Sequence, residues 1–506
     1  MICVSIGRTR HRMVLAEIEE ATRRGAQLIE LRLDFITRAI DFKRLLAVKG
    51  CPFIATLRRQ ADGGRFAGTE EQRQMLLRQI IASKEFEWVD LETDIADKIQ
   101  RFGPTQRIVS YHNLREMPKD LERIHANMCA QDADVVKIAV RAEHPLDNLR
   151  ALQLCWQAER PTIAICMGEM GLPSRILAAK FGAPFTYAAF NKERGIAPGI
   201  LSVEEMQYVY HYDQINPATR VYAVLGDPIA QSLSPLVHNR AFRQFGINAV
   251  YVPMRVPKTD FEATVDVMRK LPVHGYSITI PHKETAAQFA GSKDEMVELT
   301  QSANTLIPES GHFRAYNTDT TAAIEALKLG MSDSEAMASL AGRTVLLLGA
   351  GGVARSIGFA LRQEGAVVLV TNRNPPRALG LAEELRCRAV DWTARNAVSA
   401  EIFINCTPVG MHPNVDESPL HQSVFKPGLA VMDCIYNPET TLLVRQARDR
   451  GCRVITGVEM FVRQAARQFQ LFTGIQPPLD EMRQIVRKAV SPTGLKPAQE
   501  QTAAAD

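Results

Sequence analysis

A short apolar run that stops at a cluster of glycines constrains this chain more than any other feature. Residues 344–355 read TVLLLGAGGVAR, so a hydrophobic stretch ends at Gly349 and a helix is predicted at 353–361. The spacing G-x-G-x-x-A between a strand and a helix is typical of a dinucleotide-binding turn. Glycines let the backbone approach a pyrophosphate, whose charge is stabilised by free N–H groups at the helix N-terminus. A second strand predicted at 366–371 completes the unit, so we expect a Rossmann domain.

The bulk properties indicate a globular protein of several domains. A length of 506 residues exceeds what one hydrophobic core normally covers, so two or three domains are expected. Hydrophobic residues make up 46% of the chain and charged residues 23%, which is typical of soluble proteins. A formal net charge of +4 does not indicate nucleic-acid binding, but it suits small anionic substrates. No stretch has the character of a membrane span or a signal peptide.

Nine cysteines are scattered along the chain, several of them inside apolar runs. Because no C-x-x-C pair occurs, the sequence indicates neither a zinc site nor a disulfide framework, and no metal is expected. An odd number of buried-looking thiols fits a reducing compartment, so we expect a cytoplasmic protein.

The first 211 residues alternate short β-rich apolar runs with helix-length polar or amphipathic stretches. Eight runs occur, at 2–6, 28–33, 53–57, 88–91, 108–111, 135–140, 162–166 and 185–189. Eight βα units over about 200 residues predict a closed parallel (β/α)8 barrel, the TIM barrel. The chemistry of such a barrel lies at the carboxyl ends of its strands, where the sequence places six polar residues: Glu30, Arg32, Arg58, His112, Lys137 and Arg175.

Lys137 lies in the middle of a predicted strand, DVVKIAV, where alternation puts it on the same face as Val135 and Ala139. A lysine inside a packed barrel is costly unless it has a partner or loses its charge, and a desolvated amine suits attack on a carbonyl carbon. The alternative is a lysine that reaches solvent from a strand end. His112 is by itself either a satisfied core histidine or, beside such a lysine, a general acid and base. The arginines are either surface charges or a clamp for carboxylate and hydroxyl groups.

Residues 1–211 resemble the type I 3-dehydroquinate dehydratases. The similarity rests on ELRLD at 30–34, TLRRQADGG at 56–64, SYHN at 110–113, VVKIA at 135–139, MGEMGLPSR at 167–175 and APG at 197–199. The resemblance implies that Lys137 forms an imine with the substrate ketone. It implies that His112 removes the neighbouring proton and returns one to the departing hydroxyl. The substrate-binding residues that it implies are Ser5, Glu30, Arg32, Arg58, Asp62 and Arg175.

Two segments depart from the usual pattern of that family. D-G-G at 62–64 replaces E-G-G, which keeps the charge but shortens its reach. The lid reads I-A-P-G-I at 196–200 where the family usually has S-A-P-G-Q, so isoleucine replaces two polar substrate contacts. The resemblance implies an active dehydratase with weakened substrate binding. A non-catalytic binding module and, more remotely, a class I aldolase are the alternatives.

A polar, proline-containing stretch at 211–219 is typical of a linker. A strand predicted at 221–225 opens the second half, and a helix is predicted to begin near Pro235, after GDPIAQSLS. SITIPHKE at 277–284 is predicted as a strand that ends at Pro281-His282-Lys283. The lysine of this segment and the aspartate of YNTD, each beside Asn or Thr on predicted loops, suit a polyol site.

Residues 220–488 resemble the shikimate dehydrogenases. SLSP, TIPHK, ANT, NTD, GAGGVAR, NRN, NCTPVGM, YNP and GVEMFVRQ occur in the order found in that family. The resemblance implies that Lys283 and Asp319 transfer the proton at the carbinol oxygen while hydride moves at carbon, and a lysine held by an aspartate can supply that proton. Thr320 replaces the glycine that usually follows this aspartate, which we take as a minor departure. The implied substrate contacts are Ser232 and Ser234, on the carboxylate, with Thr279, Asn304, Tyr436 and Gln464.

The end of the second Rossmann strand indicates which dinucleotide binds. NAD-binding domains carry an acidic residue there, about 20 residues past the first glycine, for the ribose 2′-hydroxyl. This chain has Asn372 and Arg373, with Arg377 one turn later, and arginine suits a 2′-phosphate. NADP is therefore predicted over NAD, unless Arg373 is only an exposed loop residue. The predicted cofactor-binding residues are Gly349, Ala350, Gly351, Gly352, Val353, Ala354, Asn372, Arg373, Arg377, Thr407 and Gly457.

Together the two resemblances imply a fused enzyme of the shikimate pathway, which serves the biosynthesis of chorismate and aromatic amino acids. Its first half would dehydrate 3-dehydroquinate to 3-dehydroshikimate, and its second half would reduce that product to shikimate with NADPH. A quinate dehydrogenase is the alternative for the second half, although Ser232 and Ser234 favour shikimate. The expected partners are these small molecules, without nucleic acid or membrane, and the expected state is a monomer or homodimer.

The predicted domains follow from the motifs. They are a barrel at 1–213, a substrate-binding domain at 219–330 completed by helices at 459–488, a Rossmann domain at 340–457 and a disordered tail at 490–506.

Overall fold

The structure is a computed structural model that describes residues 1–195, 199–268, 273–332 and 337–491. Its contacts divide the chain into two compact units, Met1–Pro235 with Phe242–Val273, and Leu236–Ala241 with His274–Asp506. The linker predicted at 211–219 is packed, since Tyr212 and Ile215 are buried. The predicted tail, from residue 492 onward, and lid residues 196–198 lie outside the described residues.

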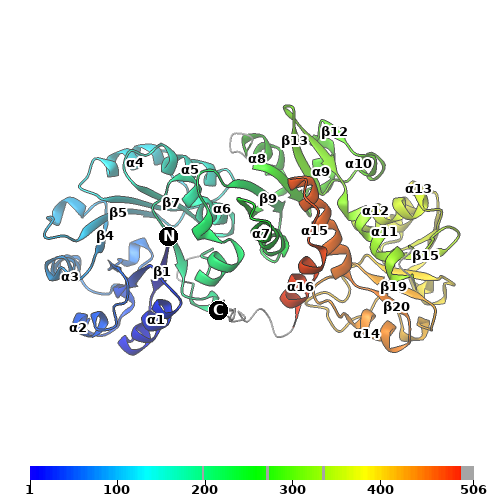
Figure 1. Cartoon of the computed structure of the whole chain (residues 1–506), viewed down its shortest axis with the longest axis horizontal. Helices are drawn as coiled ribbons and strands as arrows, with labels where there is room; N and C mark the ends of the chain where they lie inside the picture. Colours follow the sequence, from blue (N-terminus) through cyan, green and yellow to red (C-terminus); the bar gives the residue numbers. More distant parts are fainter. Residues whose placement is uncertain (196–198, 269–272, 333–336, 492–506) are drawn as a thin grey trace, which may run out of the picture. The chain divides into compact units, whose positions relative to one another are not determined.

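Eight parallel strands form a nearly closed barrel in the first unit, in the order β7-β6-β5-β4-β3-β2-β1-β8. Every apolar run predicted as a strand is one, and helices surround the strands (Figure 1). The strands are β1 (Ile2–Ile6), β2 (Leu28–Arg32), β3 (Phe53–Thr56), β4 (Trp88–Glu92), β5 (Gln106–Asn113), β6 (Val135–Arg141), β7 (Thr162–Met167) and β8 (Thr186–Ala189). The helices are α1 (His11–Arg23), α2 (Phe42–Leu46), α3 (Glu70–Ser83), α4 (Leu121–Cys129), α5 (Asp147–Gln157) and α6 (Leu172–Leu177).

The inside of the barrel has an apolar layer followed by a polar one, because side chains alternate along each strand. Leu28, Ile108 and Val135 belong to one buried cluster inside the barrel. Two residues further along the same strands lie Glu30, Ser110 and Lys137, which are buried as well. The strand register places Ser110 opposite Lys137. The next inward-facing position along each of these strands is therefore polar, and together these positions form a polar layer toward the carboxyl ends of the strands.

The rest of the first unit contains the parallel pair β9 (Arg220–Gly226) and β10 (Ala249–Arg255), with α8 (Phe261–Met268). The helix α7 (Ser234–Gln244) has residues in both units. These strands belong to a mixed six-stranded sheet of order β10-β9-β11-β13-β14-β12. The strand predicted near 221–225 and the helix predicted near Pro235 are both confirmed.

The second unit continues with β11 (Val273–Ile278), β12 (Ser292–Lys293), β13 (Thr305–Glu309) and β14 (His312–Tyr316). Its first helices are α9 (Lys283–Phe289), α10 (Glu295–Thr300) and α11 (Thr318–Gly330). The prediction of a strand over 277–284 was wrong at its end, because β11 stops at Ile278 and Lys283 opens α9. Pro281 has no N–H to donate to a strand ladder, so a strand cannot continue through it as an inner member of a sheet.

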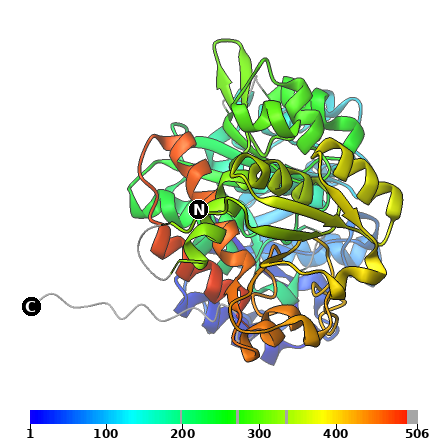
Figure 2. The same ribbon diagram turned by 90° about the vertical axis from the view of Figure 1, so that its right-hand side faces the viewer.

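The last sheet is parallel, with the order β17-β16-β15-β18-β19-β20. Its strands are β15 (Thr344–Leu348), β16 (Val367–Thr371), β17 (Arg388–Val390), β18 (Ile402–Asn405), β19 (Ala430–Asp433) and β20 (Arg453–Ile455). The accompanying helices are α12 (Gly352–Gln363), α13 (Pro375–Glu384), α14 (Leu442–Asp449), α15 (Gly457–Thr473) and α16 (Leu479–Val490). Val345 and Leu347 pack into one core and Leu346 and Leu348 into another, so both faces of this sheet are covered (Figure 2). The predicted Rossmann domain is confirmed.

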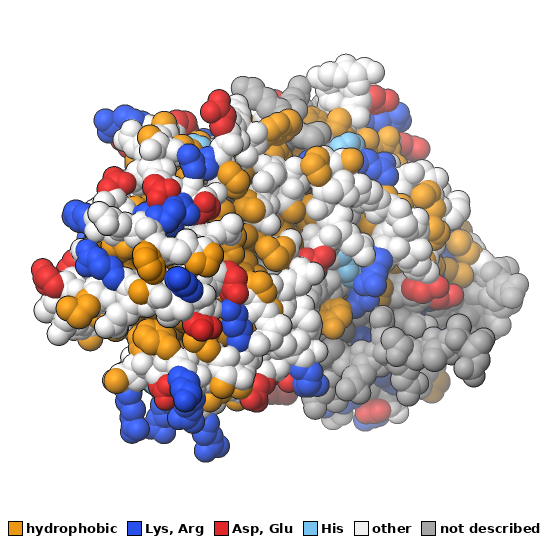
Figure 3. Space-filling model, turned by 60° about the vertical axis from the view of Figure 1, so that its left-hand side comes forward, with side chains coloured by type: hydrophobic (Ala, Val, Ile, Leu, Met, Phe, Trp, Pro, Cys, Tyr) orange, Lys and Arg blue, Asp and Glu red, His pale blue; other side chains and the backbone are white. Residues whose placement is uncertain are grey.

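On the face of the barrel that Figure 3 brings forward, acidic and basic side chains are interspersed, in keeping with the small net charge. Among the described residues, no helix combines the length and the apolar character needed to cross a bilayer.

Candidate active sites

A cavity of about 260 Å³ lies at the carboxyl ends of the barrel strands. The structure brings together all the barrel residues that the sequence singled out, because its lining includes Ser5, Glu30, Arg32, Arg58, Asp62, His112, Lys137 and Arg175. The lid residue Ile200 also lines the cavity, whereas Ile196 lies outside the described residues. An apolar side chain thus borders the cavity where the family pattern has an amide.

Lys137 is only 6% exposed and is held between two carboxylates. Its Nζ donates to Asp90 Oδ2 at 3.1 Å and lies 3.5 Å from Glu30 Oε1. The ring of Tyr187 lies beneath the amine, with its centroid 3.9 Å from Nζ. The sequence predicts a buried lysine, and the structure shows that this lysine is buried as part of an ion-paired cluster.

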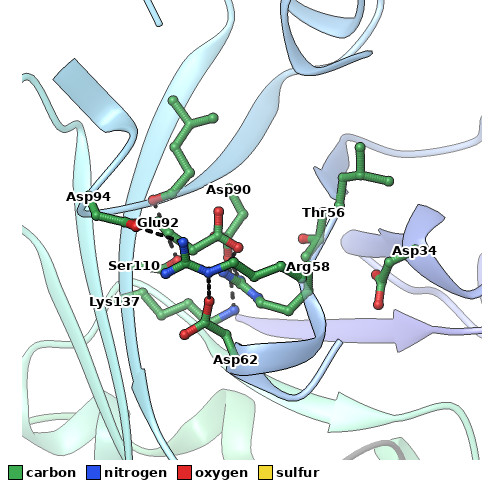
Figure 4. Close-up of polar contacts among 12 residues, drawn as sticks. Asp34, Thr56, Arg58, Asp62, Asp90, Glu92, Asp94, Ser110 and Lys137 are labelled. Carbon is green, nitrogen blue, oxygen red and sulfur yellow. Dashed lines mark hydrogen bonds and ion pairs between the residues drawn. The ribbon is translucent and has the colours of Figure 1, made fainter. Parts of the chain in front are cut away.

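Arg58 connects the lysine to a deeper set of charges (Figure 4). Its guanidinium lies 2.7 Å from Asp90 Oδ2, and its Nη1 donates to Glu92 Oε1 at 2.8 Å and to Ser110 Oγ at 2.9 Å. The buried Arg73 donates to the other oxygen of Glu92 at 2.7 Å. Arg58 was predicted to contact substrate, and in the structure its guanidinium is held by protein groups of this network.

The cluster sets the charge state of its carboxylates. Burial by itself raises the pKa of Asp90, but Arg58 and Lys137 outweigh burial and hold that pKa well below its usual range. Burial also raises the pKa of Glu30, while Lys137, Arg32 and a hydrogen bond from Ser5 lower it more strongly. Both groups are therefore carboxylates at neutral pH, and they balance the cations around the cavity.

His112 and Arg175 present polar atoms that are not satisfied by the described part of the protein. The Nδ1 atom of His112 and the Nε atom of Arg175 are buried without a hydrogen-bond partner among the described residues. Burial, together with the cations Arg58 and Lys137, lowers the pKa of His112 well below its usual value, so the ring is neutral. Burial lowers the pKa of Arg175 to about 10, which still leaves a cation at neutral pH. A neutral base therefore lines the same cavity as a guanidinium whose Nε has no partner among the described residues.

The remaining predicted residues of this cavity bind one another or their neighbours. Ser5 Oγ donates to Glu30 Oε2 at 2.5 Å. Arg32 makes two hydrogen bonds to Asp34, at 2.8 and 2.9 Å. Asp62 forms an ion pair with Arg59. The carboxylate of Asp62 is thus already paired with a protein cation at the edge of the cavity.

Asp90, Glu92, Ser110 and Tyr187 were not identified from the sequence. A signal was present for two of them, because Asp90 and Glu92 alternate with Val89 and Leu91 in the run WVDLE. A charged residue at every second position of an apolar strand faces the inside of the barrel, so it needs a charged or polar partner there, as Lys137 does. Ser110 and Tyr187 carry no such signal, since their position next to Lys137 depends on strand register and barrel closure.

The second unit contains the predicted pair of Lys283 and Asp319. Lys283 begins α9 and Asp319 lies in the first turn of α11, and Nζ donates to Asp319 Oδ2 at 2.6 Å. Both side chains are about one-fifth exposed, at 23% and 18%. The pair is therefore formed and open to a ligand. Thr320, the departure from the family pattern, is fully buried beside it.

The other side chains predicted to contact substrate in this half differ in their burial and in their contacts with the protein. Asn304 is buried, and its amide donates to Thr318 Oγ1 at 2.8 Å. Gln464 is buried on α15, Thr279 is half-buried, and Tyr436 stacks on Phe461 with 4.6 Å between ring centroids.

Ser232 and Ser234 lie at the start of α7, in the first unit. The backbone N–H of Ser234 donates to Ser232 Oγ at 3.3 Å, so Ser232 takes part in the turn that begins this helix.

The glycine-rich turn follows β15 as predicted. Gly349 has a φ of +118°, and a Cβ at this position would lie 3.0 Å from the carbonyl oxygen of Cys406, so other residues are disfavoured there. A Cβ on Gly351 or Gly352 would meet no atom within 4 Å, so these backbones border open space at the start of α12. Of the other predicted cofactor residues, Ala354 is buried, while Ala350 and Val353 pack partly against the sheet core.

The predicted 2′-phosphate residues lie at the end of β16. Arg373 and Arg377 are exposed there, and Asn372 accepts a hydrogen bond from the N–H of Asn374 at 2.8 Å. Thr407 Oγ1 donates to Asn405 Oδ1 at 2.6 Å, and Gly457 is the first residue of α15. Exposed guanidinium groups and open N-terminal glycines fit a dinucleotide with a 2′-phosphate.

Comparison with known families gives matches along most of the chain. Residues 2–217 match type I 3-dehydroquinase, and 224–306 match the shikimate dehydrogenase substrate binding domain. Residues 332–426 match shikimate / quinate 5-dehydrogenase, and 457–487 match the shikimate 5′-dehydrogenase C-terminal domain. The chain is also 32% identical over 511 residues to a chloroplastic bifunctional 3-dehydroquinate dehydratase/shikimate dehydrogenase from Arabidopsis thaliana, covering 96% of this chain and 84% of the relative.

The chain belongs to the bifunctional 3-dehydroquinate dehydratase/shikimate dehydrogenase family. It is a shikimate-pathway enzyme with both activities, and its dehydrogenase uses NADP(H). An NADP(+) shikimate dehydrogenase from Methanothermobacter thermautotrophicus is 36% identical over 287 residues, which cover 55% of this chain and 99% of the relative. A crystal structure of a shikimate dehydrogenase in complex with NADP+ covers the same share of this chain and 98% of its own, with 29% identity and a TM-score of 0.51.

Proposed function

We propose that Lys137 is the imine-forming residue of the dehydratase half and that His112 is its general acid and base. The observation that carries this proposal is the burial of Lys137 Nζ at the floor of a cavity that His112 also lines. After Nζ gives up a proton, the free amine attacks the ketone carbon of 3-dehydroquinate, and loss of water leaves a protonated imine. Neutral His112 then accepts the proton next to the imine and delivers one to the departing hydroxyl.

Arg175 is proposed to bind the substrate carboxylate. Its buried Nε has no partner among the described residues, so a carboxylate would satisfy a donor that is otherwise costly to bury. Arg58, by contrast, is proposed to act mainly by holding Asp90, because its donors already contact Asp90, Glu92 and Ser110.

Borohydride trapping tests the role of Lys137. The full chain is incubated with 3-dehydroquinate and sodium borohydride, and the modified peptide is identified by mass spectrometry. A reduced adduct on Lys137 is expected, and none in Lys137→Arg. An adduct on another lysine, or turnover retained by Lys137→Arg, would overturn the assignment.

In the dehydrogenase half, we propose that Lys283 donates the proton to the carbonyl oxygen of 3-dehydroshikimate. Asp319, whose Oδ2 lies 2.6 Å from Nζ, holds Lys283 in place. NADPH, when bound, supplies the hydride. Ser232, Ser234, Thr279, Asn304, Tyr436 and Gln464 are proposed to orient the substrate. Lys283→Met is expected to lower kcat for shikimate oxidation about 10²- to 10⁴-fold with little change in KM for NADP+.

Arg373 is proposed to bind the 2′-phosphate of NADPH. Its exposed position at the end of β16 supports this role. Arg373→Ser is expected to raise the KM for NADPH and to leave the KM for NADH unchanged. An equal effect on both cofactors would contradict a contact with the 2′-phosphate.

We further propose the domain boundaries given by the motifs, namely 1–213, 219–330 with 459–488, and 340–457. Limited proteolysis with fragment mass analysis tests them, because cuts are expected between these segments. A cytoplasmic location is also proposed, since all nine cysteines are free thiols. Fractionation of cells that express the natural gene tests the location.

A further inference from the structure

Two thiols lie side by side beyond the carboxyl ends of β18 and β19. Cys406 follows one strand and Cys434 the other, and their Sγ atoms are 3.9 Å apart. The strands pair in parallel with Asn405 opposite Asp433, so the two cysteines are the next residues along the same ladder. Paired strands lie about 4.8 Å apart, which is inside the Cα separation of about 4.4–6.8 Å that a disulfide spans.

The surroundings fix both thiols in this arrangement. The side chain of Asn405 donates to Asp433 Oδ1 at 3.1 Å, and the N–H of Cys434 donates to the carbonyl of Asn405 at 3.0 Å. Both cysteines pack against the core on one face of the Rossmann sheet, and both are partly exposed. The sulfur atoms therefore need only a local movement to meet.

We propose that Cys406 and Cys434 are a thiol–disulfide switch that lowers the shikimate dehydrogenase activity and leaves the dehydratase activity intact. The oxidant is a small disulfide of the glutathione class. The pair is specific in this chain because the other seven cysteines have no Sγ contact to a second cysteine within the described residues.

The chemistry is two successive thiol–disulfide exchanges. The Cys406 thiolate attacks one sulfur of oxidised glutathione, a protein–glutathione bond forms, and one glutathione thiolate leaves. The Cys434 thiolate then attacks Cys406 Sγ and expels the second glutathione thiolate. The two cysteine protons go to the two leaving thiolates, and the two electrons lost by the protein are gained by glutathione.

The environment of Cys434 favours its protonated form. Its hydrogen bond with Cys406, burial, and the negative charges of Asp433 and Asp319 raise the pKa of Cys434 well above its usual value. Cys406 is assigned the first attack and Cys434 the resolving role, and either order gives the same disulfide and the same two reduced glutathiones.

Closure of the disulfide would disturb the dinucleotide turn of the dehydrogenase half. The Sγ atoms must move from 3.9 Å to about 2.05 Å. The Cys406 carbonyl packs closely on Gly349, the first glycine of the dinucleotide turn, so movement of Cys406 reaches that turn.

The experiment uses the full chain in buffers of reduced and oxidised glutathione. Non-reducing peptide mapping is expected to show a Cys406–Cys434 peptide that dithiothreitol removes. NADPH oxidation with 3-dehydroshikimate is expected to fall at least tenfold and to recover on reduction, while dehydratase turnover stays within twofold. NADP+ is expected to slow the oxidation, because the bound cofactor holds the turn in place.

Cys406→Ser and Cys434→Ser are expected to keep reductase activity in the oxidising buffer. Cys387→Ser is the matched control, because Cys387 packs partly exposed on the same core and should behave like the unmodified chain. If a serine variant fails to fold, Cys434→Ala takes its place. Absence of the linked peptide overturns the proposal, and so does a linked enzyme that retains full reductase activity.

Discussion

Lys137 is buried together with the charges that neutralise it. Asp90 lies 3.1 Å from Lys137 Nζ and 2.7 Å from Arg58, so one carboxylate serves two buried cations. A buried ion pair gains little net stability because desolvation offsets attraction, but loss of one partner leaves an uncompensated charge. The arrangement therefore fixes the position of the amine and makes Asp90 hard to replace.

Asp90→Asn is expected to destabilise the barrel by roughly 3–5 kcal/mol, because Lys137 and Arg58 lose their shared counter-ion in a dry site. Chemical unfolding followed by tryptophan fluorescence measures the effect. Asp94→Asn is the control, since Asp94 is 50% exposed in its ion pair with Arg59 and should matter by less than about 1 kcal/mol. An equal loss of unfolding free energy in the two variants would show that Lys137 and Arg58 do not depend on Asp90 as their counter-ion.

His112 is expected to stay neutral at pH values where an ordinary histidine is protonated, because burial and the cations Arg58 and Lys137 lower its pKa. The unfolded chain binds a proton near pH 6.5, so the contribution of His112 to stability is complete above that pH and is lost as the pH falls toward its lowered pKa. Histidine-labelled NMR of the full chain, with His112→Gln for assignment, measures this titration. A midpoint at or above 6.5 would contradict the lowered pKa.

At the scale of whole elements, periodicity predicted the barrel strands because each buried strand is a short apolar run bounded by polar residues. The same pattern singled out Lys137, because a lysine in the middle of a buried apolar strand cannot place its charge in solvent. The end of β11 was mispredicted, because the apolar run continues past the last ladder residue to Pro281. Sequence alternation indicates which face a residue occupies, but not where hydrogen bonding between strands stops.

Asp433 joins three elements at the carboxyl end of β19. It accepts hydrogen bonds from Asn405 at the end of β18, from the N–H of Ile435 and from Thr441, which caps α14. Burial raises the pKa of Asp433 to about 6 although these hydrogen bonds lower it. Its raised pKa means that the folded chain binds the proton more tightly than the unfolded chain, whose carboxyl titrates near 3.9.

The stability contributed by protonated Asp433 is therefore present below about pH 4 and is lost as the pH rises through about 6. Asp433→Asn removes this titration. Between pH 4 and pH 7 the stability of the variant is expected to rise by about 2 kcal/mol relative to that of the unmodified chain, whatever the difference between the two at low pH. Urea unfolding across this range measures the difference, and a pH-independent difference would refute the raised pKa.

At the scale of the whole molecule, the two reactions use separate sets of residues. The described residues that line the dehydratase cavity all lie between Ser5 and Ile200, and the proposed reductase pair is Lys283 with Asp319. Each active site should therefore be removable without loss of the other, and the intermediate must leave one site before it enters the next.

An equal mixture of Lys137→Ala and Lys283→Ala chains is expected to convert 3-dehydroquinate to shikimate with NADPH, after a lag while 3-dehydroshikimate accumulates. Each variant alone should fail, Lys137→Ala by more than about 1,000-fold in dehydration because its nucleophile is gone. Product chromatography with NADPH absorbance follows both steps. A mixture that makes no shikimate would mean that the intermediate cannot pass between chains.

The sequence by itself determined the barrel, the Rossmann turn and the choice of NADP, because these depend on local periodicity, spacing and residue chemistry. It also singled out the two lysines proposed to be catalytic, Lys137 from its place in an apolar strand and Lys283 from the family resemblance. Tertiary structure alone decided that Asp90 and Glu30 flank Lys137, that Arg58 is held by protein carboxylates, and that Cys406 lies against Cys434. Those contacts join residues on different strands, and strand register with barrel closure fixes them. No local pattern in the chain encodes such distances, since they arise only when separate strands pack side by side.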